Sequence, residues 1–252
     1  VRSYLDGNSL GRPLRATRDR LPQFVEEVWG GRLIRAWDEQ WIDAPVVLGD
    51  RLGAAALGAA AGQTVVADST TVLLYKLMRA AAGRSDRTEV VADTENFPTD
   101  RFVLEGVAAE HGLTVRWITP DASHGVTEAQ VREVLNEQTA FVLLSNVAFK
   151  SGFIADVPAI TAAAHEFGAL VLWDLCHSVG LVPMQLDAWG VDLAVGCSYK
   201  YLNGGPGAPA FAYVSAAAQQ ELTQPVQGWF GAADPFGMTE TYVPARGIGQ
   251  LI

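Results

Sequence analysis

The central part of the sequence alternates between short apolar segments and amphipathic segments of helical length. Near-continuous apolar strands separated by helices are typical of a parallel or mixed sheet that is buried on both faces. The pattern predicts an α/β fold with a mixed, mostly parallel sheet of seven strands, covered by helices on both faces. The expected strands are 64–67, 89–93, 115–118, 140–145, 169–174, 192–198 and 210–214, and the expected helices are 70–82, 100–111, 127–136 and 158–167.

Residues 1–50 do not show this alternation and contain three tryptophans, at positions 29, 37 and 41. We expect this part to be an N-terminal arm or helical segment, and residues 51–252 to be the sheet domain. The alanine-rich stretch 54–61 predicts a closely packed helix at the start of that domain.

The composition restricts the possible partners and the compartment. The chain has 18 Lys and Arg against 28 Asp and Glu, for a net charge of -10, which argues against binding nucleic acid. Its apolar stretches are shorter than the roughly 20 residues of a membrane-spanning helix. The two cysteines, Cys176 and Cys197, do not suffice for a disulfide framework, and no secretion signal opens the chain. We therefore expect no membrane association and a cytoplasmic location.

Polar residues at the carboxyl ends of the predicted strands are the first candidates for a site, because ligands of such sheets bind there. Asp174 ends the strand 169–174, and His177 follows three residues later. A carboxylate in this position needs a cationic or hydrogen-bonding partner. Alternatively, Asp174 is a helix cap or a buried aspartate whose hydrogen bonds are satisfied.

Lys200 follows the strand 192–198 and lies beside a loop with glycines at 204, 205 and 207. A buried lysine can act as a nucleophile and a base, and glycines let the backbone approach a ligand closely. The alternative is a surface lysine before a flexible loop.

The third candidate is the turn 68–71, with the sequence DSTT, between the first strand and its helix. Backbone N–H groups and hydroxyls at a helix N-terminus bind phosphate well, although simple capping also explains the sequence. The glycine-rich motifs of dinucleotide and nucleoside triphosphate sites are absent from the sequence. The four histidines, at 111, 124, 165 and 177, lack the spacing of metal ligands, so no metal site is expected.

Together, an anion-binding turn, an aspartate and a later lysine fit pyridoxal 5'-phosphate. This cofactor needs a lysine for its aldehyde, an anion site for its phosphate and a carboxylate for its pyridine nitrogen.

Six segments in this order also resemble the kynureninase family, whose members are fold-type-I pyridoxal-phosphate enzymes. The segments are YLDGNSLG (4–11), NFPTD (96–100), WDLCHSVG (173–180), WGVD (189–192), CSYKYLN (197–203) and GWFG (228–231). The resemblance implies that the sheet domain binds the cofactor. It also implies a small C-terminal domain that this chain does not include, with an arginine for the substrate carboxylate that Arg246 does not match.

The resemblance implies roles for individual residues. Lys200 would bond to the cofactor aldehyde and move the substrate's Cα proton, with Tyr199 as a further proton donor. Asp174 would pair with the pyridine nitrogen near His177, while Phe97 would stack on the ring and Asp100 would support it. Thr70, Thr71, Ser145, Tyr199 and Trp229 would hold the phosphate, and Ser9 is a weaker candidate for the substrate pocket, with a backbone turn as its alternative.

The implied reaction is hydrolysis of a small amino acid, L-kynurenine or 3-hydroxykynurenine, to L-alanine and anthranilate or its 3-hydroxy form, in tryptophan catabolism. The implied assembly is a homodimer with shared active sites, in which Trp229 reaches the neighbouring subunit's site. Two alternatives remain: a cysteine desulfurase or other class-V aminotransferase relative, and a truncated cofactor-binding chain without activity. Desulfurases need a mobile cysteine late in the chain, and neither Cys176 nor Cys197 has that position.

Overall fold

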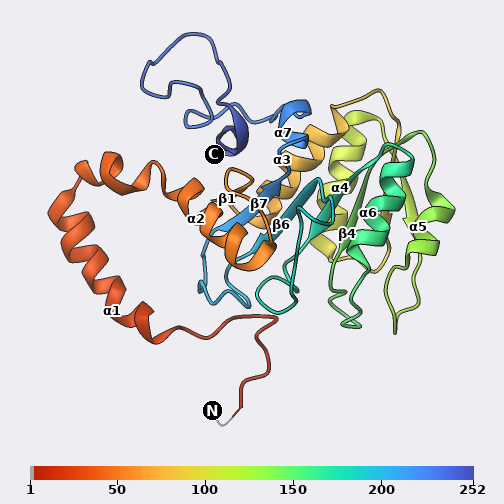
Figure 1. The fold of residues 1–252 in the computed structure, drawn as a ribbon, viewed down its shortest axis with the longest axis horizontal. Coiled ribbons are helices and arrows are strands. Elements are labelled where there is room, and N and C mark those ends of the chain that lie inside the picture. Colours follow the sequence, from red (N-terminus) through yellow and green to blue (C-terminus); the bar gives the residue numbers. More distant parts are fainter. Residues whose placement is uncertain (1–2) are drawn as a thin grey trace.

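A seven-stranded sheet organises the computed structural model, which describes residues 3–252 (Figure 1). The strand order is β1-β7-β6-β5-β4-β2-β3, and β7 runs antiparallel to both of its neighbours while the other pairs are parallel. The predicted mixed, mostly parallel sheet is confirmed. The strands are β1 (Thr64–Ala67), β2 (Glu89–Asp93), β3 (Thr114–Ile118), β4 (Thr139–Ser145), β5 (Leu170–Asp174), β6 (Leu193–Cys197) and β7 (Ala210–Val214).

Both faces of the sheet are buried, which explains why its central strands are apolar without interruption. In β5, Leu170 and Leu172 contribute to one hydrophobic core, while Val171 and Trp173 contribute to the other. Successive side chains of a strand point to opposite faces, so each strand supplies two cores at once.

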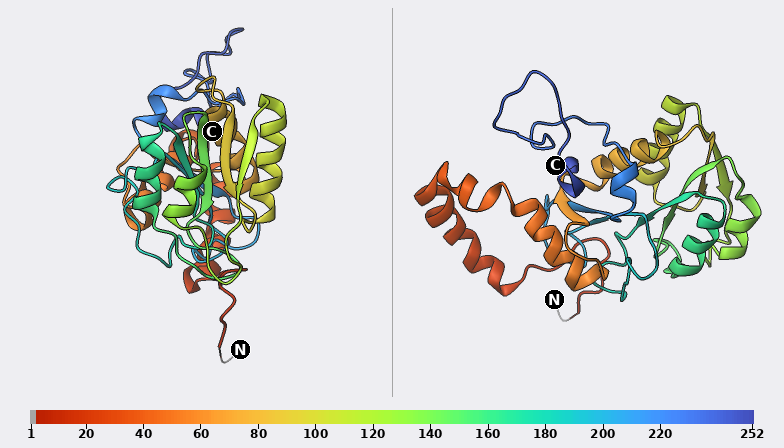
Figure 2. Two further views of the ribbon diagram at one scale, coloured as in Figure 1. Left: turned by 90° about the vertical axis from the view of Figure 1, so that its right-hand side faces the viewer. Right: turned by 45° about the horizontal axis from the view of Figure 1, so that its top comes forward.

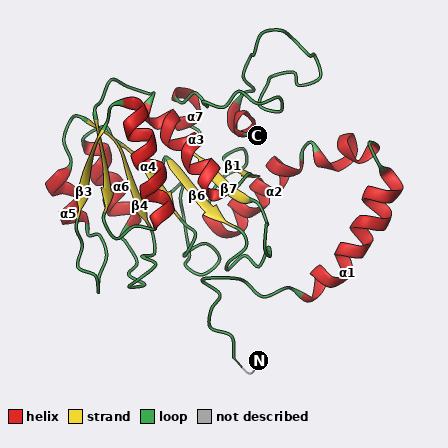
Figure 3. Ribbon diagram, turned by 180° about the vertical axis from the view of Figure 1, so that it is seen from behind, coloured by secondary structure: helices red, strands yellow, loops and turns green. Residues whose placement is uncertain are grey.

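Helices form a layer on each face of the sheet (Figures 2 and 3). Helices α3 (Thr70–Ala82) and α4 (Pro98–His111) pack together on one side, and α5 (Glu128–Val134) and α6 (Val157–Glu166) pack together on the other. Capping sets their ends. The Ser69 hydroxyl accepts a hydrogen bond from the N–H of Val72, and Thr127 forms a capping box with Gln130. The predicted helices are present, with the predicted bounds for α3 and with ends that differ by at most two residues for the others.

The N-terminal segment forms an arc that leaves the sheet and returns to it (Figure 1). Its helices are α1 (Arg15–Gln23), the π-helical segments η1 (Phe24–Gly30) and η2 (Trp37–Trp41), and α2 (Ala44–Leu52), which packs on β1. The alanine-rich helix predicted over 54–61 is shorter, because η3 (Gly53–Leu57) ends where Gly58 adopts a φ of 62°.

After β7 the chain forms the short helix α7 (Ala218–Glu221) and a long loop, and then η4 (Gly247–Leu251), a 3₁₀ turn. The sequence pattern predicts no element beyond β7. Between residues 3 and 252 no helix combines the length and the apolar character needed to cross a membrane.

Asp93 ends β2 with its side chain buried, and burial raises its pKa from 3.8 to about 6. A raised pKa in the folded protein means that stability is lost as the pH rises from about 4 to about 6. We predict that Asp93→Asn, which keeps an oxygen for the N–H of Glu95, removes this loss. Relative to the variant, the wild type should lose up to about 3 kcal/mol of unfolding free energy between pH 4 and pH 7.

Urea unfolding at the two pH values measures this difference. Asp86→Asn, at an exposed position, is the matched control and should follow the wild type. An equal pH dependence in wild type and Asp93→Asn would contradict the prediction.

Candidate active site

A pocket of about 560 Å³, including its open mouth, lies where β5 and β6 end and where α3 and α4 begin. It brings together eight of the ten predicted cofactor residues. The lining residues are Ser69, Thr70, Thr71, Phe97, Thr99, Asp100, Asp174, Cys176, His177, Tyr199 and Lys200. Among them, Ser69 belongs to the predicted anion-binding turn without an individual role, and Thr99 and Cys176 are not among the predicted site residues.

Asp174 is the last residue of β5, and its side chain is 3% exposed. Its Oδ1 accepts a hydrogen bond from the backbone N–H of Cys176 at 2.7 Å, so the alternative of a buried aspartate with satisfied hydrogen bonds holds for this oxygen. The same side chain lines the pocket. The carboxylate is thus fixed by the strand end and also available to a ligand.

Asp100 lies in the first turn of α4 and is 1% exposed. Burial raises its pKa well above the usual range, and the charge of Asp174 raises it further. Its Oδ2 has no hydrogen-bond partner within the described residues. Burial and the charge of Asp174 therefore both favour the protonated form of Asp100.

Lys200 is buried, 7% exposed, which rules out the surface lysine considered from the sequence. Its Nζ lies 2.7 Å from Nε2 of His177 and 5.6 Å from the ring centroid of Phe97. Burial lowers the pKa of His177, and the charge of Lys200 lowers it further. A neutral His177 accepts the hydrogen bond from Lys200, which places the imidazole proton on Nδ1.

Phe97 and His177 line the pocket, and both contact Phe149, which lines the neighbouring cavity. The Phe97 ring meets Phe149 edge to face, with 5.2 Å between centroids, and Phe149 stacks on His177 at 6.4 Å. Phe149 was missed by the sequence reasoning. It lies in the loop after β4, and its only sequence signal is an aromatic residue a few positions beyond the end of a buried strand.

The N-terminus of α3 supplies the part of the pocket suited to an anion. The hydroxyl of Ser69 caps the helix by accepting a hydrogen bond from the N–H of Val72 at 3.4 Å, while Thr70 and Thr71 line the pocket. The first N–H groups of a helix have no partner within it, and the helix dipole favours negative charge there.

Tyr199 precedes Lys200 and also lines the pocket. Burial, followed by the nearby Cys197 and Cys176 thiols, raises the pKa of Tyr199 to about 12. The phenol therefore keeps its proton at neutral pH and can donate it.

Two predicted cofactor residues do not line this pocket. Ser145 ends β4, donates a hydrogen bond to Oδ1 of Asn96 at 2.8 Å and lines a neighbouring cavity of about 430 Å³. Trp229 packs on Phe230 and Trp37, with ring centroids 4.5 and 6.1 Å away. Their phosphate contacts stay predictions. Ser9 lies outside the pocket and donates to Asp6 at 2.7 Å.

The N-terminal segment supports the turn that carries Lys200. The N–H of Gly11 donates to the carbonyl of Tyr199 at 2.9 Å. A Cβ at Gly11 would lie 2.0 Å from the Lys200 carbonyl oxygen and 2.8 Å from the Asn203 Cα. Only glycine permits this approach. The sequence reasoning considered Ser9 in this segment and missed Gly11, because the contact joins residues far apart in the chain.

We predict that Gly11→Ala detaches the N-terminal segment from the Lys200 turn, since the added methyl group overlaps backbone atoms. Cleavage within residues 4–14 during limited proteolysis with thermolysin should become roughly tenfold faster, because proteolysis follows the population of the open state.

Gly106→Ala is the control, since a Cβ there meets no atom within 4 Å on an exposed face of α4. It should leave cleavage unchanged and stabilise the helix by about 0.5–1 kcal/mol. Wild-type cleavage rates in Gly11→Ala would refute the role of Gly11.

Comparison with known proteins agrees with this geometry. The chain is 42% identical to a kynureninase from Pseudomonas fluorescens and 38% identical to one from Burkholderia pseudomallei, over 99% of its own length. It spans about 60% of the length of each. The fold matches the cystine C–S lyase C-DES in complex with cysteine persulfide, at TM-score 0.84 and 17% identity, over 97% of this chain and 65% of that one.

A cysteine desulfurase from Thermococcus onnurineus matches at TM-score 0.82 and 15% identity, over 99% of this chain and 62% of the other. Identities this low support the fold alone. The family described as aminotransferase class-V matches residues 54–234, which is most of the chain and includes the whole sheet. The chain therefore belongs to the class-V aminotransferase family.

Proposed function

We propose that this pocket binds pyridoxal 5'-phosphate and that the chain is the cofactor-binding part of a kynureninase. One observation carries the proposal: Lys200, Asp174 and the N-terminus of α3 line the same pocket. The pocket fits the cofactor in charge, because the carboxylate of Asp174 is buried, lines the pocket and suits a cationic ring. The 42% identity to a curated kynureninase supports the choice within the family.

Different residues would contact the phosphate, the ring, the ring nitrogen and the aldehyde of the cofactor. Thr70 and Thr71 would hold the phosphate at the helix N-terminus, and Ser145, Tyr199 and Trp229 are proposed as further contacts. Phe97 would face the ring, Asp174 would pair with its nitrogen, and Lys200 would bond to its aldehyde. When bound, the cofactor supplies an electron sink for negative charge at the substrate's Cα.

Lys200 is the proposed base for the Cα proton, and the neutral His177 at 2.7 Å orients its amine. Tyr199 keeps its phenolic proton at neutral pH, so it can supply the proton that the β-carbon gains when the Cβ–Cγ bond breaks. Asp100 supports Asp174 as a hydrogen-bond donor in its protonated form. In the proposed hydrolysis, water adds to the γ-carbonyl carbon of L-kynurenine, so its oxygen enters the carboxyl group of anthranilate. The β-carbon, which gains the proton from Tyr199, leaves as part of L-alanine.

Features of the whole protein belong to the same proposal. We propose an N-terminal arm (1–50), a cofactor domain (51–252), a further C-terminal domain, a cytoplasmic location and a homodimer. The dimer is supported by Trp229, which is 44% exposed on the C-terminal loop beside the exposed Phe236. In a dimer this aromatic group can reach the neighbouring subunit's pocket.

The desulfurase alternative requires a mobile cysteine. Cys176 and Cys197 are both buried, and they lie directly after β5 and at the end of β6. This position does not suit a residue that must carry sulfur out of the pocket.

We predict that borohydride reduction in the presence of pyridoxal 5'-phosphate attaches the cofactor to Lys200, as identified by peptide mass spectrometry. Lys200→Ala should abolish the attachment. Lys150→Ala, at an exposed lysine, should leave it unchanged. Attachment elsewhere, or none in the wild type, would contradict the proposed site.

The loaded protein should release anthranilate from L-kynurenine and no sulfide from L-cysteine. Sulfide release without anthranilate would instead support the desulfurase alternative. Covalent attachment at Lys200 without either product would support a chain that binds the cofactor and lacks activity.

A further inference from the structure

Lys76 is a buried cation on α3 that the proposed mechanism does not use. Its side chain is 6% exposed, and its Nζ donates to Oδ2 of Asp68 and to the carbonyl of Leu251, each at 2.7 Å. Lys76 does not line the pocket around Lys200. A buried ammonium group is costly unless it is paired, so this arrangement calls for an explanation.

Asp68, the partner of Lys76, is the residue at which the chain turns from β1 into α3. It adopts a φ of 51°, which is uncommon for a residue with a side chain. Its carbonyl accepts a hydrogen bond from the N–H of Ala210 on β7 at 3.1 Å. The conformation of Asp68 therefore sets the direction in which Ser69, Thr70 and Thr71 enter the helix.

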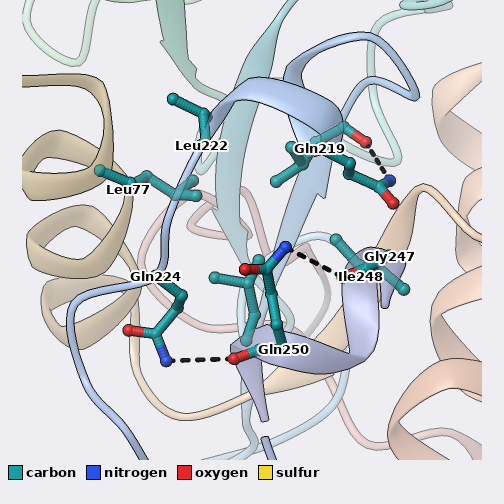
Figure 4. Close-up of a pocket in the computed structure, with 10 residues that line it drawn as sticks. Leu77, Gln219, Leu222, Gln224, Gly247, Ile248 and Gln250 are labelled. Carbon is teal, nitrogen blue, oxygen red and sulfur yellow. Dashed lines mark hydrogen bonds between the residues drawn. The ribbon is translucent and has the colours of Figure 1, made fainter. Parts of the chain in front are cut away.

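The other partner, the Leu251 carbonyl, belongs to η4, which contacts β1 and lines a small cavity opposite Leu77 of α3 (Figure 4). Gln224 donates to the Gln250 carbonyl at 3.1 Å, and the Gln250 side chain donates to the Gly247 carbonyl at 3.2 Å. Ile248 and Leu251 are both 4% exposed. These contacts fix η4, so the Lys76 ammonium is held between two anchored groups.

We propose that Lys76 is a positioning residue for the anion-binding turn. By holding Asp68 in its left-handed conformation and by linking it to η4, Lys76 keeps Thr70 and Thr71 aimed into the pocket. The inference rests on the proposed function, because it assumes that the turn binds the phosphate of pyridoxal 5'-phosphate. It predicts that replacing Lys76 weakens the part of the binding affinity that comes from the phosphate and leaves the part that comes from the rest of the cofactor unchanged.

The test compares pyridoxal 5'-phosphate with pyridoxal, which lacks the phosphate, by equilibrium dialysis against wild type and Lys76→Met. The variant should bind pyridoxal 5'-phosphate at least about tenfold more weakly and pyridoxal equally well. Inorganic phosphate should compete with pyridoxal 5'-phosphate less effectively in the variant. Equal losses for both ligands, or no loss for either, would overturn the inference.

Substitutions at Asp68 keep the proposal falsifiable if Lys76→Met does not fold. Asp68→Asn retains an oxygen acceptor and tolerates positive φ. The ratio of its affinities for pyridoxal 5'-phosphate and pyridoxal should therefore stay within about threefold of the wild-type ratio. Asp68→Val disfavours positive φ and should lose the preference for the phosphorylated ligand. Equal ratios in the two variants would refute the role of this turn.

The wild type separates this inference from the proposed function. If the wild type binds neither ligand, the proposed function itself fails and the inference falls with it. If the wild type binds both ligands equally well, the turn does not bind the phosphate. That result overturns the inference and the phosphate contacts proposed for Thr70 and Thr71, and it leaves the proposed bond between Lys200 and the cofactor aldehyde standing.

Discussion

The burial of the Asp174 carboxylate at the end of β5 is the constraint on which the site depends. A carboxylate that is 3% exposed needs compensation, and the structure provides it only in part. One oxygen accepts the N–H of Cys176, and the neighbouring Asp100 is driven toward its protonated form. Among the described residues that line the pocket, Lys200 is the single lysine or arginine, and its hydrogen bond goes to His177. A further cationic group would complete the compensation, and the pyridinium ring of the proposed cofactor is such a group.

The fold gathers these charges because parallel strands end at the same edge of the sheet. Asp174 is the last residue of β5, and Tyr199 and Lys200 follow the end of the parallel strand β6. Helices α3 and α4 begin at the same edge. The positive ends of these helix dipoles favour negative charge in the pocket, as the proposed phosphate contacts of Thr70 and Thr71 require. The site is supported from behind by contacts that never reach the ligand: Gly11 packs on the Lys200 turn, and Lys76 binds Asp68.

The sequence was sufficient for the features that depend on local pattern. Seven apolar segments became the seven strands, and the polar residues at their ends include Asp174 and Lys200, which lie together as predicted. Long-range packing was not visible. Gly11 and Phe149 act through residues far along the chain, so no local pattern marks them. The region after β7 has no hydrophobic periodicity, and η4 is positioned by side-chain hydrogen bonds from Gln224 and Lys76. The predicted phosphate contact of Trp229 depends on a neighbouring subunit, which a single chain does not test.

The central claim is that Asp174 is placed for the protonated nitrogen of the cofactor ring. The most direct test is the ratio of dissociation constants for pyridoxal 5'-phosphate and its 1-deaza analogue, in which carbon replaces that nitrogen. The wild type should prefer pyridoxal 5'-phosphate by at least about tenfold, which corresponds to about 1.4 kcal/mol. In Asp174→Asn, which keeps an oxygen for the N–H of Cys176, the preference should disappear. The same ratio in wild type and variant would contradict the account.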